Sequence, residues 1–240
     1  TNLLDGTISD RCSMYLEERA RGGAGLIIPE QTSVRIGYMR VPAMSIHSDL
    51  LLPALGSMVD AVHSYDSKII MQLGLHGGRA ASKITGHRCI APSAISSPLY
   101  TEIPEALEVD EIYQLVDEWK IAALRAQSIG FDGVEIHGCH GYLINQFLSP
   151  HTNVREDEFR GNLENRLRFA SLIHTAVREA CGPDFIIGFK MPGLENMPNG
   201  LIIEDSVQIA KMIENQGKVD YLHVSVTSAT LGYTQFPDVP

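Results

Sequence analysis

The residues best suited to chemistry lie together near the middle of the chain. His137, His140 and Tyr142 fall within six residues, directly after the apolar run 131–136. A buried strand that ends in titratable side chains is a common way to build an active site on an α/β sheet or barrel. Two imidazoles can donate hydrogen bonds to one anionic oxygen, and a phenol can protonate a strongly basic acceptor. The trio therefore predicts a catalytic site that stabilises an oxyanion.

The same two histidines are also metal-ligand types. A His-x-x-His pair is a weak zinc signal here, because no carboxylate or cysteine ligand accompanies it at the usual spacing. Histidines satisfied by local hydrogen bonds beside a packed tyrosine are the purely structural alternative. We favour the catalytic interpretation and expect no metal at this site.

Polar residues also follow other apolar runs. Gln72 lies in the run 68–73, Lys190 in the run 185–191, and Glu30 and Gln31 come directly after the run 24–29. A glutamine offers a donor and an acceptor that match an amide-like edge such as that of a pyrimidine ring. A lysine can stabilise negative charge that develops on a ring. The structural alternatives are a loop cap for Gln72 and an ion pair for Lys190.

Helical and strand patterns alternate along the chain. Apolar residues at helical spacing behind capping residues predict helices, and continuous apolar runs predict strands buried on both faces. A long connection, 74–108, has little periodicity. The expected helices cover about 10–21, 49–62, 110–128, 162–180 and 204–216, and the expected strands about 24–29, 68–73, 131–136, 185–191 and 219–226.

Strict alternation of this kind indicates parallel strands joined by crossover helices. A doubly wound sheet and a (β/α)8 barrel both fit this order. The dinucleotide fingerprint G-x-G-x-x-G after the first strand is absent, which weakens the doubly wound option. Polar residues after several different strands favour the barrel, whose active sites form at the C-terminal ends of the strands. Five strands are expected where a closed barrel needs eight, so we expect an α/β, (β/α)8 TIM barrel that is incomplete.

Composition narrows the classes of partner. The net charge of −10 argues against nucleic acid, whose phosphates an acidic surface repels. No apolar run approaches the ~20 residues of a membrane helix, and the first residues lack the pattern of a signal peptide. We therefore expect a cytoplasmic protein with no nucleic-acid or membrane partner. No CxxC pair occurs, and free thiols are expected at Cys12, Cys89, Cys139 and Cys181.

Several ordered motifs resemble a known family. They are GLIIPE at 25–30, QLGLHGGR at 72–79, APSA at 91–94, FDGVEIHGCHGYLINQFLSP at 131–150, the stretch from Asn153 to Gly161, and ENRLRF at 164–169. Together they span nearly the whole chain and resemble the old yellow enzyme family of FMN-dependent NADH:flavin oxidoreductases and ene reductases. The resemblance is closest to the branch that contains 2,4-dienoyl-CoA reductase and enoate reductases.

The resemblance implies a barrel that holds FMN at its C-terminal mouth and is reduced by NADH or NADPH. The reaction implied is reduction of the C=C bond of a small α,β-unsaturated carbonyl or enoyl substrate. By motif position, His137 and His140 bind the substrate carbonyl oxygen, and Tyr142 is the proton donor. Gln72, with Gln31 near it, binds the pyrimidine edge of the flavin, and Glu30 is a further candidate for cofactor binding. Lys190 stands where the family usually has an arginine, which keeps the charge and loses the bidentate fork.

The resemblance also implies what the chain lacks. Residues 1–240 are expected to form a single catalytic barrel domain with about strands 2 to 6, a fragment without the first and the last two strands. An iron–sulfur cluster and FAD belong only to longer relatives, and the cysteine spacing here does not match that cluster. Two alternatives stay open: a flavin-free barrel that acts as a structural or binding module, and a metal-dependent (β/α)8 hydrolase. Self-association into a homo-oligomer is also left open.

Overall fold

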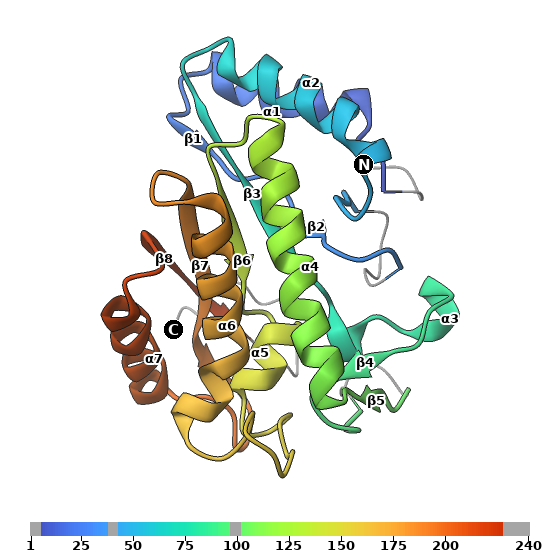
Figure 1. Ribbon diagram of the computed structural model, residues 1–240, viewed down its shortest axis with the longest axis vertical. Helices are drawn as coiled ribbons and strands as arrows, with labels where there is room; N and C mark the ends of the chain where they lie inside the picture. Colours follow the sequence, from blue (N-terminus) through green and yellow to red (C-terminus); the bar gives the residue numbers. More distant parts are fainter. Residues whose placement is uncertain (1–5, 38–42, 97–101, 228–240) are drawn as a thin grey trace, which may run out of the picture.

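The computed structural model describes residues 6–37, 43–96 and 102–227 of the 240-residue chain. Its centre is a parallel sheet in the order β1-β3-β6-β7-β8, and β2 also pairs with β3 (Figure 1). Sequential parallel strands joined by helices form part of a (β/α)8 barrel, as the sequence predicts. The strands of this sheet are β1 (Leu26–Ile27), β2 (Thr32–Ser33), β3 (Lys68–Gly74), β6 (Gly133–His137), β7 (Ile186–Glu195) and β8 (Tyr221–Thr227).

Helices cover one side of the sheet. In Figure 1, α4 and α6 run side by side in front of β3, β6 and β7. Apolar side chains fill the space between these layers, and the Trp119 ring of α4 meets the Phe169 ring of α6 edge to face. The helices are α1 (Asp10–Arg21), η1 (Asp49–Leu51), α2 (Leu52–His63), η2 (Gly77–Arg79), α3 (Ser82–Thr85), α4 (Val109–Ser128), α5 (Leu143–Leu148), α6 (Leu163–Cys181) and α7 (Ile203–Gln216).

Helix ends follow the capping rules. The Ser9 side chain accepts from the backbone N–H of Cys12 at the start of α1, and the Asn162 side chain accepts from Asn165 at the start of α6. Gly217 adopts φ +61° directly after α7, a conformation that glycine adopts without steric cost. These local signals explain why the five long helices match their predicted ranges within a few residues.

Several elements differ from the sequence prediction. The strand expected over 185–191 continues to Glu195 as β7, so Lys190 lies within the strand and not at its end. The strand expected over 24–29 is reduced to β1, because Pro29 has no N–H to continue the ladder; pairing with β3 resumes at β2. The short helix α5 was not expected. All six of its residues are buried, so its sequence has no polar face and no helical periodicity.

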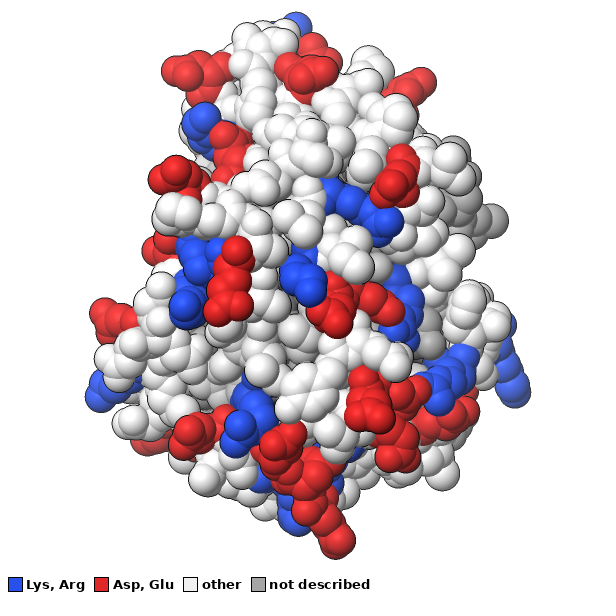
Figure 2. Space-filling view, viewed as in Figure 1, with Lys and Arg blue, Asp and Glu red and all other residues white. Residues whose placement is uncertain are grey.

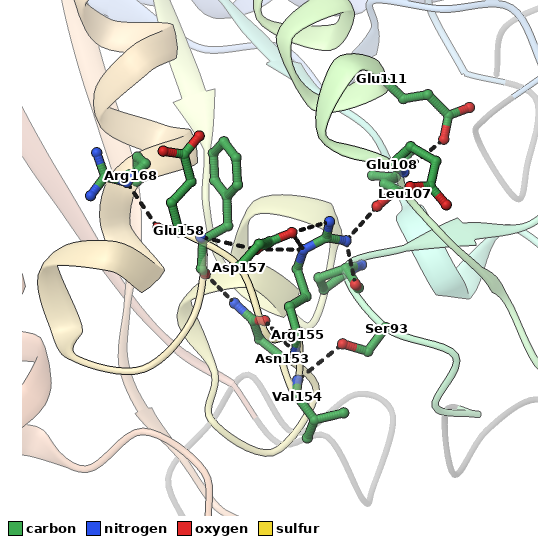
Figure 3. Close-up of polar contacts among 12 residues, drawn as sticks. Ser93, Leu107, Glu108, Glu111, Asn153, Val154, Arg155, Asp157, Glu158 and Arg168 are labelled. Atoms are coloured by element: carbon green, nitrogen blue, oxygen red, sulfur yellow. Dashed lines mark hydrogen bonds and ion pairs between the residues drawn. The ribbon is translucent and has the colours of Figure 1, made fainter.

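The long connection after β3 folds back over the C-terminal ends of the strands. It contains η2, α3 and the two-stranded sheet of β4 (Ile90–Ala91) and β5 (Glu105–Ala106). Arg155 fastens this connection to the loop after α5, as Figure 3 shows: its guanidinium donates to the carbonyl oxygens of Pro92 and Leu107 and pairs with Asp157. The Ser93 hydroxyl oxygen also accepts from the Val154 N–H at 3.0 Å.

The surface carries charges of both signs. Lys and Arg side chains alternate with Asp and Glu over the helix-covered face in Figure 2, and no continuous basic area is visible there. Among the described helices, none combines the length and apolar character that crossing a bilayer requires.

Candidate functional site

Two rows of side chains cross the sheet on the side opposite α4 and α6. Strand register aligns Gln72, Glu135, Gly188 and Tyr221 in one row, which we call the lower row. Two residues further along each strand, the same register aligns His137, Lys190 and His223 in the upper row. Side chains two residues apart face the same side of a strand. The rows therefore bring polar groups from β3, β6, β7 and β8 together on one face of the sheet.

The predicted catalytic trio is assembled in the structure. The ring centroids of His137 and His140 lie 5.1 Å apart, and those of His137 and Tyr142 lie 5.2 Å apart. His140 Nε2 lies 2.7 Å from the Ser225 hydroxyl oxygen on β8. Three rings thus converge where β6 ends, as the spacing of these residues predicts.

Backbone conformation explains how this short loop turns its side chains together. His140 and Gly141 both have positive φ, at 60° and 69°. The turn is held from outside: Gly141 N–H donates to Asn145 Oδ1 at 2.7 Å, and Arg79 Nη1 donates to the His140 carbonyl oxygen. Left-handed conformation at consecutive residues needs such support, because it is disfavoured for residues with a Cβ.

The buried carboxylate of Glu195 stabilises the same loop indirectly, through the side chain of Asn145. Glu195 Oε1 accepts from Asn145 Nδ2 at 3.0 Å, and Oε2 accepts from the Leu201 N–H at 2.9 Å. Burial raises the pKa of Glu195, and the hydrogen bonds oppose that rise. Hydrogen bonds therefore connect Glu195, at the end of β7, through Asn145 to Gly141. Gly141 belongs to the loop between β6 and α5, which we call the catalytic loop.

Both imidazoles are neutral at pH 7. Burial lowers the pKa of His137 well below its usual value, and the neighbouring His140 and Lys190 charges add to the effect. Burial, followed by the charges of Lys190 and Arg79, lowers the pKa of His140 to about 4. Each neutral ring carries one N–H, so the pair can donate to an oxygen while leaving its own nitrogens uncharged.

The predicted ring-binding residues lie beside this trio. Gln72 is buried in the lower row, and Lys190 aligns with His137 in the upper row. Gln31 is buried over Gly74: a Cβ on Gly74 would lie 1.9 Å from Gln31 Nε2 and 3.1 Å from His137 Cβ. Gln31 Nε2 and His137 Nδ1 are buried without a hydrogen-bond partner in the described part of the chain.

Glu30 lies apart from these residues. It is exposed, and it borders a surface hollow with Arg11, Cys12 and Tyr15 of α1. The structure therefore brings together six of the seven residues singled out from the sequence and leaves Glu30 on the α1 side.

A hollow that opens to solvent lies next to the catalytic loop. Arg79, Gly141 and Gln146 form one wall, Ala91 and Ile95 of the long connection form another, and Glu195 lies at the end of β7. Most of its lining is apolar apart from these polar groups, which is typical of sites for small organic molecules.

Comparison with protein families identifies the chain. The model of the NADH:flavin oxidoreductase / NADH oxidase family matches residues 2–233. The chain belongs to this family. The resemblance to old yellow enzymes found in the motifs is therefore confirmed at the level of the family.

Individual family members agree with this assignment. An NADH oxidase of Thermoanaerobacter brockii is 40% identical over 230 residues, which are 94% of this chain and 35% of that protein. A 2-naphthoyl-CoA reductase structure in complex with 2-naphthoyl-CoA superposes with a TM-score of 0.90 at 28% identity, covering 98% of this chain and 37% of the other. An old yellow enzyme homologue from Zymomonas mobilis superposes with a TM-score of 0.84 at 29% identity, covering 93% and 65%. The chain thus spans about a third of the first two proteins.

Some residues of this family member's site escaped sequence reasoning. The His76 ring stacks on the Tyr142 ring, and Arg79 donates a hydrogen bond to the His140 carbonyl oxygen. In the lower row, Glu135 accepts a hydrogen bond from Gln72. His76 and Arg79 lie in the motif at 72–79, in which the sequence predicted a role for Gln72 only. Glu135 sits two residues before His137, and the period of a strand places both on one face. That alternation is the signal that would have found it.

Cys139 adds a third metal-ligand type that sequence reasoning did not count. Ligand atoms of His137, Cys139 and His140 all lie within 4.8 Å of one another. The positive charge of Lys190 acts on all three groups and lowers the pKa of each, opposing burial at the cysteine. A cation would meet the same positive potential, whereas a partial negative charge on an oxygen is favoured there. All four cysteines are free thiols, as predicted.

Proposed function

We propose that this chain is the central part of a catalytic barrel that reduces the C=C bond of an α,β-unsaturated carbonyl compound with NADH or NADPH through FMN. The observation that carries the proposal is the convergence of two neutral histidines and a tyrosine beside Lys190, in a chain of the flavin oxidoreductase family. Residues 1–240 would act as one domain.

The polar groups around Gly74 suit a flavin ring. Gln31 Nε2 is a buried donor with no partner among the described residues, and Gly74 leaves space that a Cβ would fill. Lys190 forms no salt bridge within the described part of the chain, so its ammonium is available to stabilise negative charge on a bound ring. Gln31, Gln72 and Lys190 would hold FMN, which when bound supplies hydride to the alkene.

His137 and His140 would bind and polarise the substrate. Two N–H donors aimed at one carbonyl oxygen stabilise the negative charge that develops on it as hydride reaches the β-carbon. Because burial and nearby positive charge keep both rings neutral, this stabilisation does not depend on protonation near pH 7. Burial of the site also excludes water, which strengthens each hydrogen bond.

Tyr142 would complete the reaction by donating its hydroxyl proton to the α-carbon. The phenol pKa near 10 suits a strongly basic carbon acceptor. Its ring is fixed between His76 and the Arg79 guanidinium, whose Cζ lies 5.9 Å from the ring centroid. A fixed ring reduces the freedom that the hydroxyl group must lose in the transition state.

FMN titration tests the proposal directly. We expect flavin fluorescence to be quenched on binding and the bound flavin absorbance to bleach with NADH or NADPH and to return on addition of 2-cyclohexenone. If the chain takes up no FMN, we would conclude that it is a flavin-free structural or binding module. Stoichiometric zinc with no flavin would instead support the metal-dependent hydrolase.

A further inference from the structure

One buried carboxylate joins the lower row. Glu135 is completely buried on β6 and contacts a hydrogen-bonding group from each side. Gln72 Nε2 donates to Glu135 Oε1 at 2.6 Å, and the Tyr221 hydroxyl donates to Oε2 at 3.0 Å. His223 Nδ1 lies 3.0 Å from the same oxygen. A buried carboxylate is stable when donors surround it in this way, and these come from β3 and β8.

Gly188 makes this arrangement sterically feasible. It lies in the lower row between Glu135 and Tyr221, and a Cβ at Gly188 would lie 2.1 Å from Tyr221 Cζ and 2.4 Å from the hydroxyl oxygen. The tyrosine ring therefore crosses over β7 to reach β6. Burial, together with the Glu135 charge, raises the pKa of Tyr221, so the hydroxyl keeps its proton and remains a donor.

The carboxylate decides which end of the Gln72 amide points inward. An ionised carboxylate only accepts hydrogen bonds, so the amide nitrogen must face Glu135. The amide oxygen is then directed away from Glu135, and within residues 6–37, 43–96 and 102–227 it has no hydrogen-bond partner. Without Glu135, either end of the amide could face the site.

We propose that Glu135 is a positioning residue that fixes the Gln72 carboxamide so that Gln72 presents only a hydrogen-bond acceptor to the bound ring. The inference rests on the proposed function, because it names the ring as a flavin. It assigns complementary roles to the neighbours: Gln31 and Lys190 offer donors, and Gln72 offers the acceptor. An imide edge, with carbonyl oxygens on either side of an N–H, needs both kinds of partner.

The first experiment needs no ligand. In the ¹⁵N-labelled chain, we expect the Gln72 side-chain NH₂ to exchange slowly with solvent and to show through-space contacts to Tyr221. Glu135→Gln removes the acceptor-only carboxylate, and we expect the Gln72 NH₂ signals to shift and exchange at least tenfold faster. Fast exchange of the wild-type NH₂ would overturn the proposal even if the variant failed to fold.

The second experiment measures FMN affinity in a double-mutant cycle. We expect Glu135→Gln to weaken FMN binding roughly tenfold, as the loss of one charge-assisted hydrogen-bond arrangement implies. Gln72→Ala should weaken binding by a similar factor in the wild type and by much less in the Glu135→Gln background. Non-additivity of this kind is the signature of a residue that acts through another.

Glu118→Gln is the matched control, since it changes a partly buried carboxylate of α4 that pairs with Arg35 and does not contact Gln72. It should leave FMN affinity and the Gln72 NH₂ signals unchanged within twofold. Equal weakening by both carboxylate variants, or additive effects in the cycle, would refute the positioning role. If the wild type binds no FMN, the proposed function fails for this chain, and the NH₂ measurement still decides the role of Glu135.

Discussion

The ring of Tyr142 lies flat against the ring of His76, with centroids 4.1 Å apart and planes at 18°. His76 is buried at the end of β3, and Tyr142 is the residue before α5. The stack joins two segments that are distant in sequence and limits the directions in which the phenol hydroxyl can point. The proposed proton donor, held in this way, is expected to act on one position of the substrate only.

Replacing Tyr142 by Phe keeps this stack and removes the proton. We expect NADH-dependent flavin reduction to proceed at the wild-type rate, while reoxidation by 2-cyclohexenone slows on the order of 100-fold. Stopped-flow absorbance of the two half-reactions separates these effects. Tyr113→Phe on α4, where the hydroxyl donates to Glu158, is the control and should change neither rate. Equal slowing of both half-reactions would point to a positional role for Tyr142.

The pKa of His140 can be measured by its NMR titration. We expect a midpoint at about 4 in the folded chain, well below the usual 6.5, because burial and the Lys190 and Arg79 charges disfavour the protonated ring. Since the folded pKa is lowered, protonation favours the unfolded state, and stability falls as pH drops from about 6.5 toward 4. A midpoint near 6.5 would contradict the neutral donor role.

His174 on α6 offers a stability test away from the site. Both of its ring nitrogens are buried without a partner in the described chain, its ring packs against Phe189, and burial lowers its pKa to about 3. We expect His174→Leu to raise the free energy of unfolding by about 1 to 2 kcal/mol at pH 7, because it removes two unpaired buried groups.

The gain from His174→Leu should increase below pH 6.5. There the unfolded wild type binds a proton that the folded ring does not take up until about pH 3. Urea unfolding at pH 7 and pH 5 measures both effects. His87→Leu, at an exposed position, should change stability by less than about 0.5 kcal/mol. A smaller advantage at pH 5 than at pH 7 would show that His174 is protonated in the folded chain.

Gly188→Ala tests the packing beneath the site. The new Cβ would overlap the Tyr221 ring, so we expect the ring to leave Glu135 and stability to fall by about 1 to 3 kcal/mol. Denaturant unfolding measures the loss of stability, and the NMR signals of the Tyr221 ring report its displacement. Gly56→Ala in α2, where the nearest atom lies 3.8 Å from the new Cβ, should instead stabilise the chain by up to about 1 kcal/mol.

The contacts of Arg155 shown in Figure 3 should keep the long connection after β3 in its folded conformation. Arg155→Ala removes a nearly buried guanidinium that binds two carbonyl oxygens and Asp157, and we expect a loss of about 2 to 3 kcal/mol. Amide hydrogen exchange should increase over residues 89–96. Arg88→Ala, which breaks exposed ion pairs with Glu105 and Glu111, should cost less than about 1 kcal/mol. Similar losses of stability in both variants would contradict a special role of Arg155 in holding the long connection.

The sequence predicted the alternation of strands and helices because long helices carry caps and buried strands are continuous apolar runs. It missed α5, since a helix buried on every side has no periodic pattern. The sequence also did not predict that the pairing with β3 is interrupted near Pro29, so that β1 and β2 are separate short strands. Both features depend on neighbours that are distant along the chain.

The site was predictable to the extent that strand ends are predictable. His137 and Lys190 were found because they close buried runs, and strand register then aligns them. The strand period could have placed Glu135 beside His137, but its pairing with Tyr221 could not be found, because it requires the register across β7 and the missing side chain of Gly188. His76 reaches Tyr142 only through the fold of the connection after β3.

The positive φ of His140 also restricts how this site can change over generations of mutation. Among residues with a side chain, Asn, Asp and His adopt that conformation most readily. Of these, Asn keeps a neutral N–H donor, while Asp would bring a negative charge toward a developing oxyanion. In a library of variants at position 140, we therefore expect nearly all folded and active members to carry His or Asn. A change of substrate at this position then comes from exchanging one hydrogen-bond donor for the other, because the loop conformation cannot be remodelled.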